Sequence, residues 1–459
     1  MNEQDIKGFF ADEEDLIHDD YLFFTFWFET AEKPEHAVAE LACELSTAQW
    51  KRPGIDEDYR PRHAAKVVHL EILSEARRPS FMTSFAKGDH FYRGLVRLAY
   101  PQINIGPRLP NLLTTVCGEG AFFCKAISAV KLVDIDFPAS WLADFQGPRF
   151  GIEGLRGILD VYDRPIFLGV VKPNIGLDPK SFAGIAYESW IGGLDIAKDD
   201  EMLGDTTWSP LIRRCREVGR KRKEAEDLTG EKKIYLANIT DEVDRLRELH
   251  DLAVREGANA VMVNAEPVGL SALRMLAKHA SVPVVAHFAG IAPMTRLPYY
   301  GVSSIVLTKL QRLAGADLII VPGFGGRMKT EEEEVLDTVD ACTEPFGHCK
   351  RSLPTPGGSD WAGTLPLVSE KLRSHEFGFI CGRGVFNHPM GPTAGAASLR
   401  QAWEAIVQRL PLADYAADHR ELEVALEAFG GNGVSEPPKK AVAPAGAVPL
   451  VEFLSMVNR

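Results

Sequence analysis

The feature that most constrains the fold of this chain is a series of short apolar runs, each followed by a stretch with helical spacing. Eight runs recur: PIFLGVVKP (165–173), GLDIAKDD (193–200), KIYLANIT (233–240), AVMVNA (260–265), VPVVAHF (282–288), DLIIVPG (317–323), SLPTPGG (352–358) and FGFICGRG (377–384). Eight strand–helix units are the number that closes a (β/α)8 TIM barrel. A doubly wound open sheet is the alternative, but it usually has fewer strands and often a GxGxxG turn after the first strand, which this sequence lacks.

The N-terminal third of the chain does not alternate in this way. Runs at 22–28, 65–73, 90–100 and 126–137 predict strands, and PEHAVAELACEL (34–45) predicts a helix that begins near Pro34. Because strands and helices follow one another irregularly, we predict an α+β domain, a small sheet with helices on one face. The predicted organisation is therefore an N-terminal domain (1–145), a barrel (146–430) and a Pro/Ala-rich tail (431–459).

Composition excludes several classes of function. Lys and Arg number 51 and Asp and Glu 64, which gives a net charge of −13 and argues against a nucleic-acid partner. No apolar run approaches the 18 residues or so of a membrane span, and the N-terminus has no signal-peptide h-region. The seven cysteines form no CxxC pair, so we expect reduced thiols in a cytoplasmic protein.

The strongest chemical pattern lies where the second barrel strand ends. KDDE (198–201) places a lysine and three carboxylates in four residues, and catalytic groups of TIM barrels lie at the C-terminal ends of strands. Strand alternation points Lys198 and Asp200 to the same side, with Glu201 at the turn. Carboxylate oxygens on a rigid strand suit Mg²⁺. A solvated charge run in a loop is the alternative interpretation.

Glycines after the seventh and eighth strands form a second pattern. Gly357-Gly358 and Gly382-Arg383-Gly384 are typical of the loops that bind phosphate in such barrels, with Arg383 as a charge partner, although plain turns use glycine too. After the sixth strand, Thr330 with Glu333 predicts a capping box and hence a helix start, which leaves GFGGRMK (323–329) as a candidate lid. A lone histidine such as His287 is either a core residue or a site residue, and both interpretations stay open.

Four motifs together resemble one known family, the ribulose-bisphosphate carboxylase superfamily. GGLDIAKDDE (192–201) is similar to its metal-site motif, KPNIGL (172–177) to its strand-1 motif, ELSTAQW (44–50) to its N-terminal loop, and GRGVFNHPMGPTAGAASLRQAWEA (382–405) to its strand-8 region. The similarity spans residues 20–425. The combination resembles form IV, the Rubisco-like proteins, and most closely the photosynthetic-bacterial branch. The resemblance implies a ferredoxin-like N-terminal domain before the barrel.

The resemblance also implies roles for individual residues. Lys198 would be carbamylated by CO₂ and would bind Mg²⁺ together with Asp200 and Glu201. The other catalytic positions would be Lys172, His287 and Arg327, the last aligned with the mobile-loop lysine. The positions that would bind the phosphorylated substrate are Gly357, Gly358, Gly382, Arg383, Gly384, Glu44, Thr47, Trp50, Glu119 and Asn174. Of these, the N-terminal loop residues 44–50 would reach the site of a partner subunit, which implies a homodimer.

Departures from the family pattern remove cations from the predicted site. Asn174 stands for a lysine, Phe288 for an arginine, Ile320 for a histidine and Pro356 for a serine, while Glu119 stands for an asparagine. A bisphosphate would lose several charge-assisted bonds of roughly 1.5–3 kcal/mol each. We therefore predict that the chain is not a CO₂-fixing carboxylase.

The predicted activity is Mg²⁺-dependent enolisation or isomerisation of a small phosphorylated, ketose-like metabolite. By analogy with form IV relatives that act on methylthio-sugar phosphates, the substrate would contain sulfur. Two alternatives stay open: a decarboxylase or transcarboxylase of a β-keto acid phosphate, and a non-catalytic regulatory protein in sulfur metabolism or the stress response.

Overall fold

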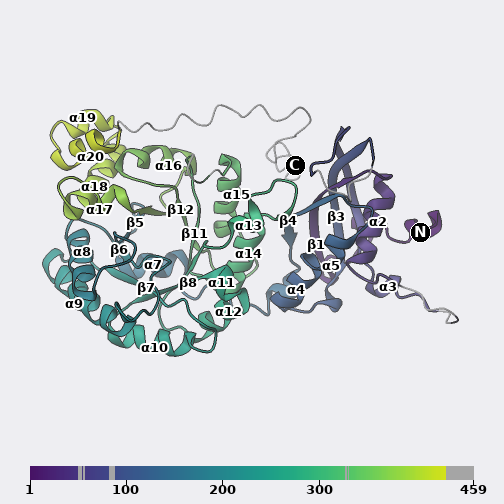
Figure 1. The fold of residues 1–459 in the computed structure, drawn as a ribbon, viewed down its shortest axis with the longest axis horizontal. Helices are drawn as coiled ribbons and strands as arrows, with labels where there is room; N and C mark the ends of the chain where they lie inside the picture. Colours follow the sequence, from purple (N-terminus) through teal and green to yellow (C-terminus); the bar gives the residue numbers. More distant parts are fainter. Residues whose placement is uncertain (50–53, 55–56, 82–87, 326–327, 329, 431–459) are drawn as a thin grey trace. The chain divides into compact units, whose positions relative to one another are not determined.

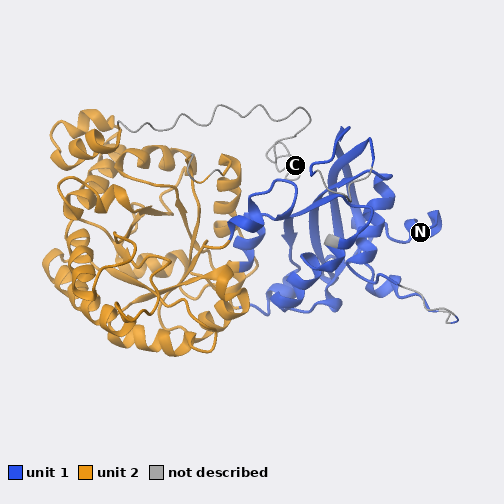
Figure 2. Cartoon of the chain, in the orientation of Figure 1, with its two compact units in different colours: residues 1–145, 291–310, 440–459 blue, residues 146–290, 311–439 orange. Residues whose placement is uncertain are grey.

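The computed structural model describes residues 1–49, 54, 57–81, 88–325, 328 and 330–430. Of these, residues 1–145 and 291–310 form one compact unit and residues 146–290 and 311–430 form the other (Figure 2). Residues 291–310 fall within the range predicted for the barrel domain, yet they group with the first unit. The predicted tail lies outside the described residues.

The first unit is built on a five-stranded sheet with the order β10-β4-β1-β3-β2. Its strands are β1 (Tyr21–Thr30), β2 (Lys66–Ala76), β3 (Phe91–Pro101), β4 (Ala129–Asp136) and β10 (Gly301–Val302). β1 pairs antiparallel with both β3 and β4, and every residue of β1 after Tyr21 is buried. The aromatic run that predicted this strand therefore fills the middle of the sheet, and the four strands expected from the sequence are confirmed.

Short helices accompany this sheet. They are α1 (Glu3–Lys7), α2 (Pro34–Glu44), α3 (Arg60–His63), α4 (Leu109–Val116), α5 (Glu119–Phe123), α6 (Ala139–Leu142) and α13 (Ala292–Thr295). α2 begins at Pro34 as predicted and buries Val38, Leu41 and Ala42. Proline suits this position because the first turn of a helix needs no N–H from it.

The fifth strand comes from a distant part of the chain. β10 pairs in parallel with β4, and the Lys131 Nζ in β4 donates to the carbonyls of Thr295 and Leu297 at 2.8 and 2.9 Å. These contacts explain why residues 291–310 belong to the first unit. Sequence periodicity did not predict a strand here, because two residues carry no alternation.

The second unit contains the eight strands expected from the sequence, all parallel. They are β5 (Ile166–Val170), β6 (Ile196–Lys198), β7 (Ile234–Asn238), β8 (Ala260–Asn264), β9 (Val284–His287), β11 (Leu318–Pro322), β12 (Leu353–Gly357) and β13 (Gly378–Cys381). Their order, β12-β11-β9-β8-β7-β6-β5-β13, follows the chain around a nearly closed barrel. Between β12 and β13 a single bridge joins Asp360 to Cys381. The predicted TIM barrel is confirmed.

Helices ring these strands (Figure 1). They are α8 (Pro179–Ile191), α9 (Leu211–Thr229), α10 (Leu246–Glu256), α11 (Ala265–Val268), α12 (Leu270–His279), α15 (Glu332–Thr343), α16 (Leu365–Leu372), α17 (Arg383–Phe386), α18 (Pro392–Gln408), α19 (Leu412–Ala416) and α20 (Arg420–Gly430). α14 (Ser304–Ala314) begins in the first unit and ends in the second. The start predicted for α15 is wrong: Glu331, not Thr330, is its N-cap, and no side chain caps it. Within the described part of the chain, no helix is both long enough and apolar enough to cross a bilayer.

The barrel interior is a packed apolar core. Alternate strand residues such as Leu168, Leu236 and Met262 point inward and meet Ile152 and Leu155 of α7 (Gly151–Leu159). α7 precedes β5 and therefore lies near the N-terminal ends of the strands. With that end filled, polar chemistry is left to the C-terminal ends of the strands, which we call the barrel mouth.

Candidate active site at the barrel mouth

The ends of β5, β6 and β13 meet at the mouth through Lys172. Its Nζ donates to Asp200 Oδ2 at 2.9 Å, so the residue after β5 pairs with a carboxylate that follows β6. A Cβ added at Gly382 would lie 3.2 Å from the Lys172 Cε, so β13 ends against the same side chain. Three separate sequence motifs therefore converge on one lysine.

Lys198 is the most unusual group in the mouth. Its side chain is fully buried, and its Nζ has no hydrogen-bond partner among the described residues. The nearest carboxylate oxygen with which it pairs is Glu201 Oε2, at 3.9 Å. Burial lowers the pKa of Lys198 to about 8, against the opposing pull of the Glu201 and Asp200 charges. About a tenth of this amine is therefore uncharged at pH 7, against far less for an ordinary lysine.

His287, at the end of β9, faces the same carboxylate. Its Nε2 lies 3.5 Å from Glu201 Oε2, and its Nδ1 accepts the Ala289 N–H at 3.1 Å. Because Nδ1 accepts, the proton of the neutral ring sits on Nε2 and points into the mouth. Burial, and then the Lys198 charge, hold the pKa of His287 well below its usual value, so the ring is neutral at pH 7. His287 is thus placed as a hydrogen-bond donor.

Two asparagines that the sequence analysis gave no role complete the framework. The Asn238 Nδ2 donates to the carbonyls of Asp200 and Glu201 at 3.1 and 3.0 Å, and the Asn264 Nδ2 donates to the Glu201 carbonyl at 2.9 Å. The Asn264 Oδ1 is buried without a partner among the described residues. Their positions at the ends of β7 and β8 were the available signal, but an asparagine there is not distinctive by type.

The donor set at the end of β6 fits a magnesium ion. The Lys198 Nζ is buried beside the Asp200 and Glu201 carboxylates, and no hydrogen bond from the described residues satisfies it. Buried polar groups are normally hydrogen-bonded, so an orphaned ammonium beside two carboxylates indicates a missing component. Hard oxygen ligands are those that Mg²⁺ prefers. The unsatisfied Lys198 Nζ and the two carboxylates therefore fit a cation site on their own chemistry, apart from any resemblance.

Gly357 and Gly358, at the end of β12, were predicted to bind phosphate, but the N–H of Gly358 already has an acceptor. The Gly358 N–H donates to Asp360 Oδ2 at 2.9 Å, and Asp360 Oδ1 accepts from the Thr364 Oγ1. A Cβ at Gly358 would lie 2.1 Å from the Phe324 carbonyl oxygen, so close packing alone demands glycine here. Burial raises the pKa of Asp360 to about 6, which still leaves a carboxylate at pH 7. A phosphate at Gly358 would have to displace this carboxylate.

The residues after β13 leave more room for an anion than those after β12. Arg383 is exposed at the first residue of α17, and Gly382 is half-buried beside Lys172. Gly384 is buried, and a Cβ there would lie 2.5 Å from the Trp361 Cβ, so its small size serves packing. Of the five predicted phosphate-binding residues at the ends of β12 and β13, Arg383 is exposed, Gly357, Gly358 and Gly382 are half-buried, and Gly384 is buried.

The predicted residues of the first unit form a separate group. Glu44 ends α2 and Glu119 begins α5, and both are exposed. A Cβ on Gly120 would lie 2.7 Å from the Glu44 carbonyl oxygen, so these two helix ends are neighbours. The Thr47 Oγ1 is buried without a described partner. Trp50 and Arg327 lie outside the described residues.

The departures from the carboxylase pattern give the mouth apolar walls. Ile320 is buried in the barrel core, and Phe288 packs against that core with its ring stacked on His287 at 4.8 Å between centroids. Asn174 is half-buried two residues after Lys172. Phe288 therefore places hydrocarbon beside His287 and Ile320 lies in the core, so neither position offers a cation for a second phosphate.

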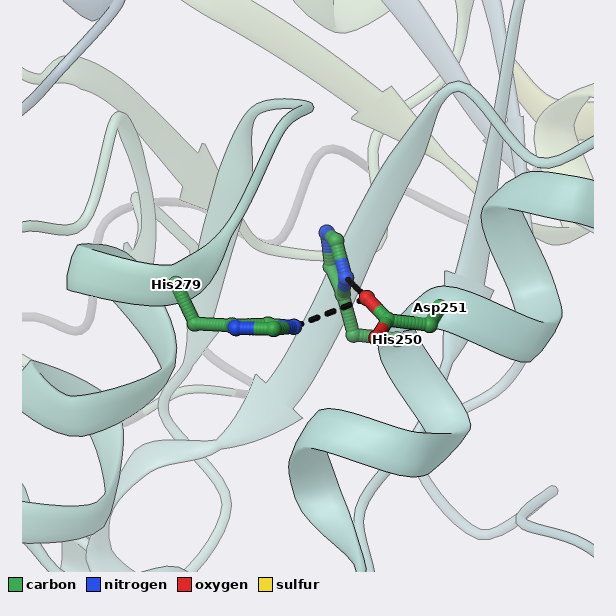
Figure 3. A group of neighbouring side chains, drawn as sticks. All are labelled: His250, Asp251 and His279. Carbon is green, nitrogen blue, oxygen red and sulfur yellow. Dashed lines mark hydrogen bonds and ion pairs between the residues drawn. The ribbon is translucent and has the colours of Figure 1, made fainter.

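A further group of potential ligands lies on the helices (Figure 3). His250 and Asp251 of α10 and His279 of α12 bring one ligand atom each within 4.8 Å of the others. Asp251 Oδ1 lies 2.8 Å from His250 Nδ1 and 2.7 Å from His279 Nε2. The Ser281 N–H donates to His250 Nε2 at 3.2 Å, so the proton sits on Nδ1, the atom that a metal would need. We interpret this group as a carboxylate that links two histidines, not as a metal site.

The chain contains a TIM barrel whose polar side chains gather at the C-terminal ends of the strands, where TIM-barrel enzymes have their active sites. Residues 151–429 match the family described as ribulose bisphosphate carboxylase large chain, catalytic domain. This chain belongs to that family, and its relatives identify it as a Rubisco-like protein. A ribulose bisphosphate carboxylase-like protein of Allochromatium vinosum is 58% identical over 432 residues, 94% of each chain.

Two other comparisons bear on fold and function. The crystal structure of a rubisco-like protein from Burkholderia fungorum has a TM-score of 0.82 at 32% identity and covers 89% of this chain and 100% of that one. A 3-oxo-isoapionate-4-phosphate decarboxylase of Rhizobium rhizogenes is 31% identical over 412 residues, 89% of this chain and 98% of the relative. The family therefore includes members with names other than carboxylase.

The buried Lys198 predicts a measurable dependence of stability on pH. Its pKa is about 8 in the folded chain against 10.5 ordinarily, so folding disfavours the ammonium by about 3 kcal/mol below pH 8. We expect Lys198→Met to be more stable than the wild type at pH 7, because it removes this cost. The advantage should shrink as pH rises from 8 and vanish above 10.5, where the wild-type amine is neutral in both states. Urea unfolding across that range measures the gap, and a gap independent of pH would contradict the assignment.

Proposed function

We propose that this chain is an Mg²⁺-dependent enzyme that removes the proton α to the carbonyl of a small phosphorylated, ketose-like metabolite, an enolisation or isomerisation without CO₂ fixation. The observation that carries the proposal is the fully buried Lys198 Nζ, which has no hydrogen-bond partner among the described residues, beside the Asp200 and Glu201 carboxylates. These residues would hold the ion, with Lys198 as its CO₂-derived carbamate. Mg²⁺ bound there would polarise the substrate carbonyl and stabilise the negative charge that develops on its oxygen.

The residues of the chain supply the proton chemistry. Lys172 donates to Asp200 at 2.9 Å. With Asp200 engaged as a ligand and the Lys172 proton released to solvent, the neutral amine would accept the α-proton, and the C–H electron pair would move toward the carbonyl oxygen. The His287 Nε2–H is placed to donate a hydrogen bond to the substrate, and the unpaired Asn264 Oδ1 to accept one from a substrate hydroxyl.

The substrate has one phosphate in this proposal. The exposed Arg383 beside the half-buried Gly382 supports an anion on the strand-8 side, whereas the Gly358 N–H already has Asp360 as its acceptor. On the opposite side, Phe288 and Ile320 favour a less polar group, such as a thioether, over a second phosphate. A sulfur-containing sugar phosphate would satisfy both ends.

We propose that the functional unit is a cytoplasmic homodimer. Glu44 and Glu119 are exposed on neighbouring helix ends of the first unit, and the resemblance assigns the N-terminal loop that includes Thr47 and Trp50 to the partner's active site. Sedimentation velocity of the wild type tests the assembly, and a monomer at micromolar concentration would overturn it.

The test of the function is proton exchange. Phosphorylated 2-ketones, with and without a thioether at the far end, are incubated in D₂O with the protein, Mg²⁺ and bicarbonate and followed by ¹H NMR. The proposal expects the α-proton signal of at least one ketone to disappear faster than in a control with Glu201→Gln. Equal rates for both proteins across the panel would overturn the proposal.

A decarboxylase of a β-keto acid phosphate is the second candidate. The decarboxylase relative from Rhizobium rhizogenes supports it, since loss of CO₂ passes through the same enolate. Release of CO₂ from a phosphorylated β-keto acid, with slow exchange of the 2-ketones, would favour this candidate over the first.

The Asp360 contact predicts a change in anion affinity. In Asp360→Asn a neutral amide replaces the carboxylate that accepts the Gly358 N–H. Removing a like charge of a few ångströms' separation favours the anion by about 1–2 kcal/mol, so inorganic phosphate should bind about tenfold more tightly. Isothermal titration at pH 7.5 measures the change in phosphate affinity. Unchanged or weaker affinity would show that the anion does not approach the end of β12.

A further inference from the structure

The proposed ligand residues Lys198, Asp200 and Glu201 lie at or just after the end of β6, and this strand is too short to hold them in place by itself. β6 contains only Ile196–Lys198, and the next three residues leave the sheet. A metal site requires its ligands to be held to within a fraction of an ångström, which a free turn does not provide. The structure shows what provides it: a buried network on the side of β6 that faces away from the mouth.

Asp199 is the centre of this network. Strand alternation turns it away from Lys198 and Asp200, and it is completely buried. Its Oδ1 accepts the Tyr235 hydroxyl at 3.0 Å, and its Oδ2 accepts the Arg214 Nε at 3.1 Å and the Asn238 N–H at 3.0 Å. Donors from α9 and β7 therefore fix the residue that lies between two proposed ligand-bearing positions.

Arg214 extends the network beyond the ligands. Its guanidinium is fully buried and, besides Asp199, it donates to the Ser209 carbonyl at 2.6 Å and the Gly204 carbonyl at 3.1 Å. These carbonyls belong to the loop that follows Glu201. One side chain therefore joins the residue before Asp200 to the loop after Glu201, so both carboxylates are held between fixed points.

We propose that Arg214, acting through Asp199, is a positioning residue that sets the cation affinity of the Lys198, Asp200 and Glu201 site. The inference rests on the proposed function, because it concerns the same site. Among the described residues, Arg214 forms no hydrogen bond or ion pair with a proposed ligand side chain, so its effect is on their placement. Residues that orient ligands from behind typically change metal affinity by 10–100-fold when mutated.

The chain contains a matched control at the other end of the same strand. Asp195 precedes β6, is almost fully buried, and pairs with Arg164 through two contacts of 2.6 and 2.7 Å. Like Asp199, it also accepts a backbone N–H, that of Phe167 at 2.8 Å. Removing Arg214 leaves Asp199 without a cation, whereas removing Arg164 leaves Asp195 with Arg400, whose Nη2 lies 3.3 Å from its Oδ1. Both variants take a guanidinium away from a buried carboxylate, so both should lose stability, Arg164→Gln the less. The two sites differ in their distance from the mouth.

The experiment compares Arg214→Gln with Arg164→Gln in the full chain. Mn²⁺ binding is measured by electron paramagnetic resonance of the free ion, with bicarbonate present, and stability by thermal unfolding. We expect Arg214→Gln to weaken Mn²⁺ binding at least tenfold and Arg164→Gln to stay within twofold, although both variants lose thermal stability. Arg214→Lys, which keeps the charge beside Asp199, should recover part of the affinity. Equal changes in the two glutamine variants, or wild-type affinity in Arg214→Gln, would overturn the proposal.

Amide hydrogen exchange of the metal-free proteins separates this proposal from the proposed function. Faster exchange in residues 200–204 of Arg214→Gln than of Arg164→Gln is the expected sign of lost placement, and equal exchange would overturn it. If the wild type and Glu201→Gln bind Mn²⁺ equally, or neither binds it, the proposed metal site is wrong. The hydrogen-exchange comparison still decides in that case whether Arg214 positions the turn after β6.

Discussion

Replacing Lys172 by methionine is expected to slow α-proton exchange about a thousandfold, because general base catalysis by a positioned side chain contributes on that scale. Mn²⁺ affinity should not fall, since the variant also removes the ammonium that pairs with Asp200 Oδ2 at 2.9 Å. Exchange of the responsive ketone is measured by ¹H NMR at saturating Mg²⁺, so that a change in affinity does not enter the rate.

The control for this variant is Lys278→Met, which removes an exposed lysine near the end of α12. It should exchange at the wild-type rate. A Lys172→Met protein that keeps more than a tenth of wild-type activity would show that another group accepts the proton, and the neutral fraction of Lys198 makes that residue the next to test.

Asp200→Asn should lower the exchange rate by at least about a thousandfold for a different reason. The substitution removes one negative ligand and with it much of the several kcal/mol that a bound cation contributes to the developing charge. It also deprives Lys172 of its partner, while the Met202 N–H that donates to Asp200 Oδ1 at 3.2 Å keeps an acceptor in the asparagine oxygen. Rate and Mn²⁺ affinity are measured on the same preparation.

Asp241→Asn is the matched control, a carboxylate just after β7 that pairs with Arg245 at 2.8 Å. It should leave both rate and affinity near the wild-type values. A normal rate in Asp200→Asn, with Mn²⁺ affinity also normal, would remove Asp200 from the site.

The barrel was predictable because its signal is local. Each strand, such as β7 or β11, is a continuous apolar run bounded by polar residues, and eight of them in series leave few alternative folds. β10 carried no such signal. Gly301–Val302 becomes a strand only because β4, more than 160 residues earlier in the chain, offers a free edge. Pairing of that kind depends on tertiary structure and has no pattern in a single sequence.

The sequence indicated which residues to place in the candidate site, but not which contacts those residues make. Strand alternation correctly separated Asp199 from Lys198 and Asp200, but nothing in the sequence showed that Arg214, fifteen residues later, would bind Asp199. The glycine pattern at 357–358 indicated phosphate, yet the side chain two residues on accepts the N–H that phosphate would need. Asp and Asn commonly bond to nearby backbone in this way, and the motif alone does not say which acceptor is present.

The capping box predicted at Thr330 failed for a similar reason. Thr330 and Glu333 have the right spacing, but the chain enters α15 through Glu331 in an extended conformation, and α15 begins at Glu332. The three glutamates of its first turn already favour the helix N-terminus through the helix dipole, so no side-chain cap is needed there.

The central claim is that the end of β6 is a divalent metal site, and Mn²⁺ titration with bicarbonate tests it most directly. We expect one saturable site per chain that disappears in Glu201→Gln and persists in Asp251→Asn, which disrupts the histidine-linked carboxylate between α10 and α12. No saturable site, or a site that survives Glu201→Gln and is lost in Asp251→Asn, would contradict it.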